Sequence, residues 1–553
     1  MKKNTTKRSL LASLLALVMC VTMLVGTTFA WFTDSASTAV NKIQAGKLKI
    51  ELQYATAWDA ETGEPTAWED AEGKTLNFRT VDGRTTNILW EPGCTYTLPE
   101  LRIVNKGDLA LKYKIYISGI AGDAELNDAI NWSYMVYSNF DGMYAPRNGD
   151  DLTRIDCISG EMIPGVYGDM YGDATNPIVI KGEMRTDAGN EYQGLTIDGI
   201  GITVYATQYT HENDSESNQY DKDAAYPTGA SIVGLNGTYD TLTAAAKAWR
   251  ESKGIVTSGG NMGGHPADLT SVDTISWIIS GSVGSGDGAG VVGTSGCLLS
   301  GGYIYPSIAV KNIYVKGVNN AELKNEIGAD YAFSAGAKNT ENVVYDGVTF
   351  PEFVSFNINV ENVTFKNCTF KGGLKVMQAI NVTVDNCKFE GDGTKDYAFF
   401  AQAVPADSMK TVQFTNNTVS GFMRGINATA GSKAAVTISG NTITNITGKT
   451  GSVAYGSAIQ LTSAKTFVVT DNAISNVAVN ALHIWASDDG TQKCEADSIV
   501  IRNNTISAKY LCWNQAEYDM TKVTSADNDC TGIEIPNKCC TKTEEISSAF
   551  LLN

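Results

Sequence analysis

The chain has 553 residues, which is enough for two or more domains with substantial cores. Its formal net charge of −18 disfavours nucleic acid and anionic membrane surfaces, so neither is an expected partner. Histidine occurs three times, and no two histidines lie one helical turn apart beside a glutamate, as a zinc peptidase motif requires. We therefore predict no metal site and no resident cofactor, and whether the acidic loops bind calcium stays open.

Residues 1–30 have the features of a secretory signal peptide. Basic residues precede an apolar run from Leu10 to Val25, and Thr28-Phe29-Ala30 supplies a cleavage site that ends in a small residue. We expect cleavage between Ala30 and Trp31, which predicts a secreted protein, either extracellular or associated with the cell surface. The alternative is a retained membrane anchor, but the run is short for a span of about 20 residues. After cleavage, no contact with a membrane is expected.

Residues 31–228 are predicted to form an antiparallel β-sandwich. Short segments of alternating hydrophobicity, separated by turn residues, are typical of that fold. Examples are Lys47–Leu52, Tyr96–Val104 and Leu109–Ser118, the last two joined by the turn Asn105-Lys106-Gly107-Asp108. The first half of the chain should therefore form one all-β domain.

Four stretches in this part are distinctive: TFAWFTDSAS, NKIQAGKLKIEL, EPGCTYTLPELRIVNKGDLALKYKI and VYATQYTHENDSESNQYD. They resemble the TasA/camelysin family of secreted biofilm-matrix fibre proteins, over about residues 1–228. The resemblance implies a jelly-roll-like domain that self-associates. In that arrangement the segment from Trp31 to about Leu48 of one subunit adds a strand to the next. The alternative is that this segment completes the sheet of its own subunit.

Residues 229–272 are predicted to be a linker followed by a helical cap. The segment Thr241–Ser252 has the pattern of an amphipathic helix. It would cover the open end of the domain that follows, where unpaired strands would otherwise invite edge pairing.

An eight-residue pattern recurs seven times within residues 273–508. The first, third and eighth positions are apolar and the fourth and fifth are mostly polar, which indicates a strand, a bend and a second strand with one buried face. The copies start 19 to 32 residues apart, as in a solenoid with loops of variable length. We predict a right-handed parallel β-helix similar to that of pectate-lyase-like proteins. The copies begin at Val343, Val363, Val382, Val412, Val436, Phe467 and Ile499.

The sixth position of the pattern predicts a ladder inside the solenoid. Buried Asn amides on successive turns can hydrogen-bond to one another, which offsets the cost of burying them. Cys368 and Cys387 take this position on adjacent turns, and we favour stacked thiols over a disulfide because each fills an apolar slot. Residues 509–553 are predicted to be a cysteine-containing C-terminal tail or cap. The ladder residues are Cys368, Cys387, Asn417, Asn441, Asn472 and Asn504.

A further strand in each turn carries the candidate ligand-binding residues. Alternation places one amide, imidazole or indole side chain per turn on its outer side, with an arginine and a phenylalanine nearby. Amides bond sugar hydroxyls and aromatic rings stack on sugar rings, so this strand predicts a glycan-binding face. The alternative is an ordinary solvated face. The residues are Phe399, Arg424, Asn427, Gln460, His483 and Trp485.

The sequence does not predict catalytic residues. A lyase of the pectate type needs grouped carboxylates for calcium and a basic side chain, and a glycosidase needs two paired acids. The outer positions of the repeat are instead rich in threonine. We expect a structural or adhesive matrix protein that self-associates through its N-terminal domain, with polysaccharide as a candidate ligand. The competing hypothesis is a polysaccharide lyase or glycoside hydrolase acting around Arg424, His483 and Trp485.

Overall fold

The computed structural model describes most of residues 48–533; the longest stretches outside the described part are 81–89, 147–157, 163–173, 209–225, 263–270, 287–308 and 327–339. The predicted signal peptide, its cleavage point between Ala30 and Trp31 and nearly all of the predicted donor segment lie outside the described residues. The described residues are mainly strands, and α3 (Leu242–Ser252) is the main helix. Among them, no helix is both long and apolar enough to cross a membrane.

The N-terminal part contains two antiparallel sheets that share one hydrophobic cluster. One side of the cluster comes from residues such as Ile103, Trp132 and Ile180, and the other from Leu111 and Ile115. The larger sheet has the order β2-β1-β4-β10-β7-β8, with β3 paired to β10, and the smaller has the order β12-β5-β9. The larger sheet consists of β1 (Ile50–Trp58), β2 (Pro65–Asp70), β3 (Thr95–Thr97), β4 (Leu101–Asn105), β7 (Ile130–Ser138), β8 (Met143–Pro146) and β10 (Ile178–Met184). The smaller sheet consists of β5 (Leu111–Ser118), β9 (Ile158–Met162) and β12 (Gly201–Gln208). A separate pair is formed by β6 (Ala121–Gly122) and β11 (Ile197–Asp198).

One predicted strand in this part is divided. Tyr96–Val104 forms β3 and β4 rather than a single strand, with Pro99 between them. Proline has no N–H for a sheet ladder, so it favours an interruption at this point. The prediction for Leu109–Ser118 agrees closely with β5.

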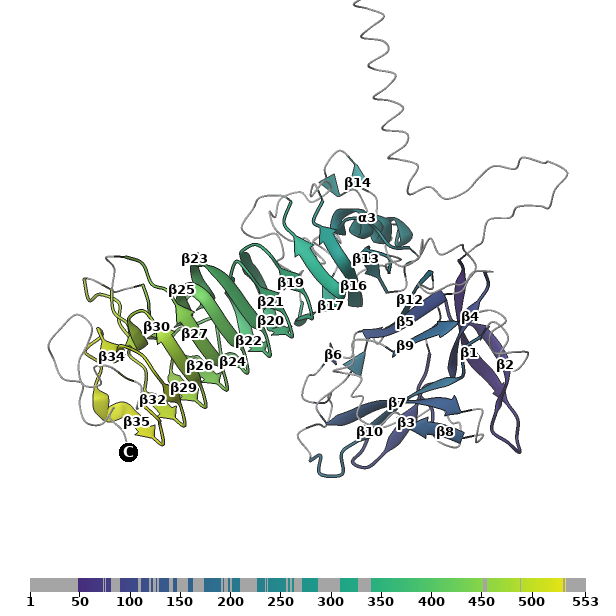
Figure 1. The fold of residues 1–553 in the computed structure, drawn as a ribbon, viewed down its shortest axis with the longest axis horizontal. Coiled ribbons are helices and arrows are strands. Elements are labelled where there is room, and N and C mark those ends of the chain that lie inside the picture. Colours follow the sequence, from purple (N-terminus) through teal and green to yellow (C-terminus); the bar gives the residue numbers. More distant parts are fainter. Residues whose placement is uncertain are drawn as a thin grey trace, which may run out of the picture.

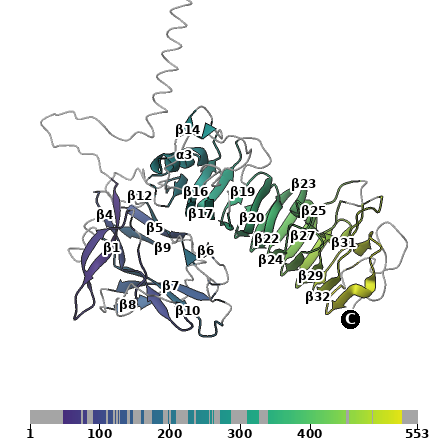
Figure 2. The same ribbon diagram turned by 180° about the vertical axis from the view of Figure 1, so that it is seen from behind.

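The second half of the chain is a solenoid of parallel strands (Figures 1 and 2). Its sheet has 21 strands, of which the first, β13, pairs antiparallel with β16. The repeat copies pair in register, so Val343 lies opposite Val363, and Val363 opposite Val382. The predicted all-β architecture, antiparallel sheets followed by a parallel stack, is confirmed at this level. The strands are β13 (Gly229–Ile232), β16 (Ser271–Gly284), β17 (Ala309–Lys324), β18 (Asn342–Asp346), β19 (Thr349–Phe350), β20 (Val354–Lys366), β21 (Thr369–Phe370), β22 (Leu374–Asp385), β23 (Lys388–Gln402), β24 (Thr411–Thr415), β25 (Thr418–Thr429), β26 (Ala435–Ser439), β27 (Thr442–Ile446), β28 (Ile459–Ser463), β29 (Thr466–Thr470), β30 (Ala473–Val477), β31 (Asn480–Ile484), β32 (Ser498–Arg502), β33 (Thr505–Ile506), β34 (Tyr510–Asn514) and β35 (Val523–Ala526), with a separate hairpin of β14 (Thr257–Ser258) and β15 (Asn261–Met262).

The bend predicted at the fifth position of the repeat is a left-handed backbone turn. In all seven copies φ at this position lies between 50° and 72°. Only Gly, Asn and Asp adopt this conformation readily, which explains why the position is restricted to them. The residues are Gly347, Asn367, Asn386, Asn416, Gly440, Asp471 and Asn503.

The solenoid continues beyond residue 508, where the sequence pattern was expected to end. β34 pairs with β31 and β35 pairs with β32, so part of the predicted C-terminal cap is another turn. An eighth copy of the pattern begins at Val523 and is hard to recognise, because Ser525 replaces the apolar third residue. The solenoid boundary predicted at 508 is therefore wrong.

The opposite end of the solenoid is covered by the predicted helix. α3 begins after Thr241, whose hydroxyl accepts a hydrogen bond from the N–H of Ala244. Its buried residues Leu242 and Trp249 join the same hydrophobic cluster as Trp277 of β16. The helix thus closes the core at the first turn (Figure 1).

The N-terminal part and the solenoid are in direct contact. Tyr205 of β12 packs in one cluster with Ile278 of β16 and Val318 of β17. Lys114 donates a hydrogen bond to Asn319 Oδ1 at 3.2 Å. This joint therefore contains both apolar and polar contacts.

Candidate functional site

The ladder predicted at the sixth repeat position is present as a continuous chain of amides. Each Asn Nδ2 donates to the Oδ1 of the Asn one turn further on, over 3.1 Å from Asn417 to Asn441, 2.8 Å from Asn441 to Asn472 and 2.9 Å from Asn472 to Asn504. The same Oδ1 atoms accept the backbone N–H of the preceding ladder residue, as Asn441 Oδ1 does from Asn417 at 2.8 Å. The ladder continues to Asn528, which the sequence reasoning missed. Its role is structural, because all five amides are buried.

Cys368 and Cys387 extend this ladder toward the N-terminus as free thiols. The N–H of Cys368 donates to Cys387 Sγ at 3.4 Å, and the N–H of Cys387 donates to Asn417 Oδ1 at 2.8 Å. Burial raises the pKa of the Cys387 thiol, which keeps it protonated. The prediction of stacked thiols is confirmed for this pair.

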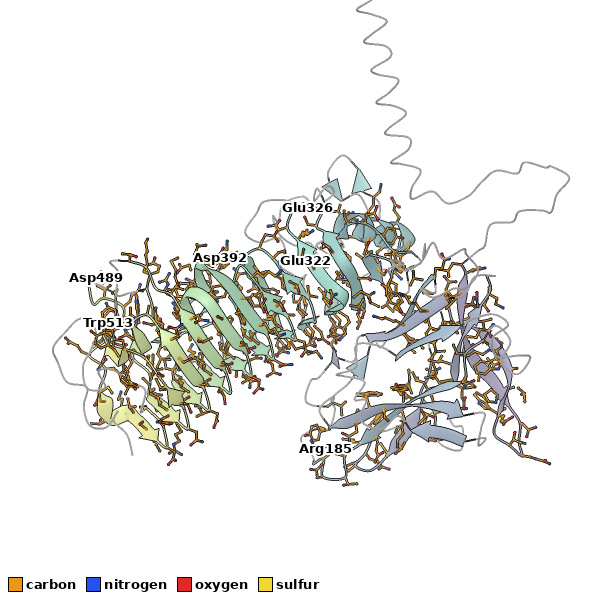
Figure 3. All side chains as sticks on the ribbon, viewed as in Figure 1. Arg185, Glu322, Glu326, Asp392, Asp489 and Trp513 are labelled. Atoms are coloured by element: carbon orange, nitrogen blue, oxygen red, sulfur yellow. The ribbon has the colours of Figure 1, made fainter. Side chains whose placement is uncertain are left out.

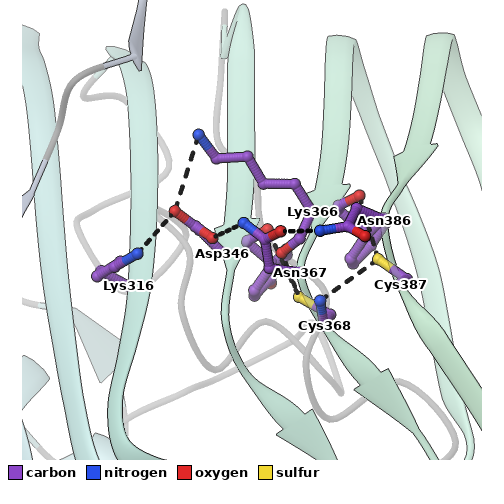
Figure 4. A network of polar contacts seen from close by, with 9 residues as sticks. Lys316, Asp346, Lys366, Asn367, Cys368, Asn386 and Cys387 are labelled. Atoms are coloured by element: carbon purple, nitrogen blue, oxygen red, sulfur yellow. Dashed lines mark hydrogen bonds and ion pairs between the residues drawn. The ribbon is translucent and has the colours of Figure 1, made fainter. Parts of the chain in front are cut away.

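A charged cluster lies outside the ladder at the same bend (Figure 4). The buried carboxylate of Asp346 is 3.0 Å from Lys316 Nζ and 3.7 Å from Lys366 Nζ, and it accepts a hydrogen bond from Asn367. Burial opposes ionisation of Asp346, but the two lysines and the Asn367 amide outweigh it and hold its pKa below the usual value. The charges are compensated within the cluster, which indicates a role in stability.

Three of the six predicted glycan residues, Asn427, Gln460 and His483, follow one register line across the solenoid. Phe400, Asn427, Gln460, His483 and Trp513 are successive cross-strand partners on β23, β25, β28, β31 and β34. The prediction that Asn427, Gln460 and His483 share one side of the sheet therefore agrees with the register. Trp513, which the sequence reasoning had assigned to the tail, completes the line; it lies near the C-terminal end of the solenoid (Figure 3).

Burial changes the role of these residues. Asn427 is 4% exposed, Gln460 5% and His483 0%, so they cannot meet a ligand directly on the surface. Their polar groups bond to neighbours instead: Asn427 Nδ2 donates to the Tyr397 hydroxyl, and Gln460 Nε2 donates to Thr462. They form an inner layer that supports the side chains above it.

Phe399 is placed differently from the prediction. Its ring lies in the solenoid core and stacks on Phe414 with centroids 4.9 Å apart. Tyr397 and Phe400, which flank the buried pair Ala398 and Phe399, are half-buried instead, and their rings are 5.0 Å apart. The prediction for Phe399 was therefore wrong, because two consecutive residues of the run YAFF are buried and strict alternation does not hold there.

Half-buried aromatic rings surround Arg424. Its guanidinium lies 3.6 Å from the Tyr397 ring centroid and 4.1 Å from that of Tyr455. Arg424 also donates to both carboxylate oxygens of Asp396, through Nε at 2.6 Å and through Nη2. Trp485 lies two residues after His483, just past the end of β31, and is half-buried. We call the rings of Tyr397 and Tyr455 beside Arg424, with Phe400 next to Tyr397 and with Trp485, the aromatic surface.

His483 sits beneath this surface as a neutral, buried imidazole. Its ring stacks on Trp513 with centroids 4.3 Å apart, and Nε2 donates to Gln515 Oε1 at 2.9 Å. Nδ1 is buried without a hydrogen-bond partner. The pKa of His483 is lowered to about 4, mainly by burial; the Gln515 contact opposes this and the positive charge of Arg424 adds to it.

The described residues do not assemble a recognisable hydrolytic or lyase centre here. No described carboxylate contacts His483, and the Asp396 carboxylate is held by Arg424. In the part of the chain that the structure covers, no group of three or more His, Cys, Asp or Glu side chains is arranged to hold a metal ion. The arrangement is better suited to contact through ring faces than to acid–base chemistry.

Comparison with known proteins finds no match to a family model, to a curated protein or to a solved structure. The resemblance of residues 1–228 to the TasA/camelysin family therefore stays a prediction from the sequence. A functional assignment for the second half has to come from the aromatic surface and the layer beneath it.

Proposed function

We propose that this protein is an exported structural or adhesive protein of the cell surface or extracellular matrix, whose solenoid binds polysaccharide through the aromatic surface. The observation that carries the glycan role is the set of half-buried rings around Arg424, fixed from below by hydrogen-bonded amides. Ring faces held in place with little freedom to move are suited to stacking on sugar rings.

We further propose that the solenoid is a right-handed parallel β-helix and that the N-terminal part is a jelly-roll-like sandwich. Right-handed crossovers are strongly preferred between parallel strands of one sheet, which supports the handedness. The two antiparallel sheets with a shared cluster support the sandwich.

Binding to immobilised polysaccharides tests the glycan role. Purified protein should be retained on at least one matrix polysaccharide, and Trp485→Ala should reduce its retention. Retention that is unchanged by substitutions at Trp485 and Tyr397 would show that the aromatic surface is not the binding site.

Self-association through the N-terminal part is proposed on the resemblance to fibre-forming proteins. Removing residues 31–41 should abolish fibres seen by electron microscopy while leaving a folded monomer by circular dichroism. Fibres that survive the deletion would refute strand donation by this segment.

The competing enzymatic role involves Arg424, His483 and Trp485, of which Arg424 lies close enough to His483 to affect its pKa. Incubation with pectin, alginate and other glycans, followed by detection of new reducing ends and of unsaturated products, distinguishes the two roles. Product release that His483→Gln abolishes would favour an enzyme over a binding protein.

A further inference from the structure

The positive charge of Arg424 is already paired with a carboxylate within the protein. Asp396 takes both ends of its guanidinium fork, and the rings of Tyr397 and Tyr455 lie against the guanidinium. An arginine that recognises a carboxylate or a sulfate needs its donor fork free, because bidentate contact is the source of its selectivity. Arg424 in this state lacks that free fork.

The layer beneath the rings carries no charge to replace it. Asn427 and Gln460 are amides, and Thr429 and Thr462 donate their hydroxyls to Asn427 Oδ1, each at 3.0 Å. His483 stays neutral near pH 7 because it is buried. An anionic sugar above this layer would lose hydration without gaining a counter-charge.

Three described lysines at the margins of the aromatic surface are each already close to a ring or a carboxylate. Lys375 Nζ lies 5.1 Å from the Phe400 centroid, and Lys449 Nζ lies 5.3 Å from that of Tyr455. Lys395 faces Asp392 at 3.9 Å. Against a chain of net charge −18, this arrangement does not create the positive field that attracts a polyanion.

We propose that the aromatic surface selects neutral polysaccharides and rejects acidic ones, an inference that rests on the glycan-binding role proposed above. The ligand is a chain of uncharged pyranoses whose apolar faces stack on Tyr397, Phe400 and Trp485. The Arg424–Asp396 pair sets this selectivity, since Asp396 cancels a charge that would otherwise favour uronates or sulfated sugars.

The test compares full-length wild-type protein with Asp396→Asn, which frees the guanidinium of Arg424. Affinity electrophoresis uses neutral gels containing β-glucan or galactomannan and acidic gels containing polygalacturonate or chondroitin sulfate. Asp392→Asn is the matched control, because it removes the same charge from β23 at a side chain that Lys395, rather than Arg424, faces. Circular dichroism and thermal unfolding check that each variant is folded.

Wild type should be retarded by a neutral polysaccharide and bind acidic ones roughly tenfold more weakly or not at all. Asp396→Asn should gain salt-sensitive binding to acidic polysaccharide by about tenfold, and Asp392→Asn should not. If Asp396→Asn does not fold, Arg424→Gln replaces it, and retained neutral binding supports the inference. Preference of the wild type for acidic polysaccharide overturns the selectivity but leaves glycan binding intact, whereas binding to neither class overturns both.

Discussion

Two sets of buried amides in the solenoid satisfy their hydrogen-bonding groups in different ways. In the inner ladder from Asn417 to Asn528 the same residue recurs on every turn, and each amide meets the next. Along the line beneath the aromatic surface the residue changes from turn to turn, and His483 Nδ1 is left without a partner. Where the same residue recurs on every turn, each buried amide finds its hydrogen-bond partner on the next turn. A region in which the residue changes from turn to turn is therefore where a binding surface can form.

The inner ladder should be the more sensitive of the two regions to a single substitution. Asn441→Leu leaves the Phe414 carbonyl and the Asn417 N–H without their partners, so we expect a loss of about 4 kcal/mol in the free energy of unfolding. Urea denaturation monitored by circular dichroism measures it. Thr442→Ala, at the next and exposed position, should change stability by less than about 0.5 kcal/mol. Similar effects for both would contradict the ladder's role.

Substitutions in the Asp346 cluster test whether a buried charge in the repeat depends on its partners as strongly as the ladder amides do. Asp346→Ala leaves Lys316, a partly buried cation, without its carboxylate and should cost about 3 kcal/mol. Because the folded-state pKa of Asp346 is lowered, this stabilisation is present above the ordinary Asp pKa and is lost as pH falls through the lowered value. Unfolding measured against pH should show the loss only in strong acid.

Lys366→Met is the graded control for this cluster. Lys366 Nζ is farther from the carboxylate than Lys316 Nζ and its side chain is more exposed, so we expect a loss below about 1 kcal/mol. A larger loss for Lys366→Met than for Lys316→Met would show that the ranking by distance and burial is wrong.

Acid should weaken the layer beneath the aromatic surface before it affects the ladder. The pKa of His483 is lowered from 6.5 to about 4 on folding, so the unfolded chain takes up the proton first as pH falls below 6.5. Stability should be unaffected above that pH and should decline by up to about 3 kcal/mol on reaching pH 4. His483→Gln should remove this decline. Fluorescence of Trp513, which stacks on His483, offers a local probe.

Substitution on the aromatic surface should affect binding more than folding. Trp485→Ala should weaken retention by a bound polysaccharide about tenfold, close to 1.4 kcal/mol. Phe353→Ala removes an exposed aromatic ring elsewhere on the solenoid and should leave binding unchanged. Equal losses for the two variants would mean that binding depends on general hydrophobic contact.

The sequence by itself determined the features that depend on local chemistry. Residues able to adopt positive φ fixed the bends, alternation fixed the buried side of the repeated strands, and the recurring Asn specified the inner ladder. The helix from Thr241 followed from its amphipathic pattern and its cap. Where a local signal was weak, as in the turn that begins at Val523, the prediction ended too early.

Only the tertiary structure decided which outward side chains reach the surface. Alternation gives the direction of Asn427 and His483 but not what covers them, because coverage comes from parts of the chain far apart in sequence. The same is true of Arg424, whose partners Asp396 and Tyr455 lie 28 and 31 residues away along the chain and are brought to it by the stacking of turns. The alternation along a strand describes the residues of one turn, whereas the aromatic surface contains side chains from several turns.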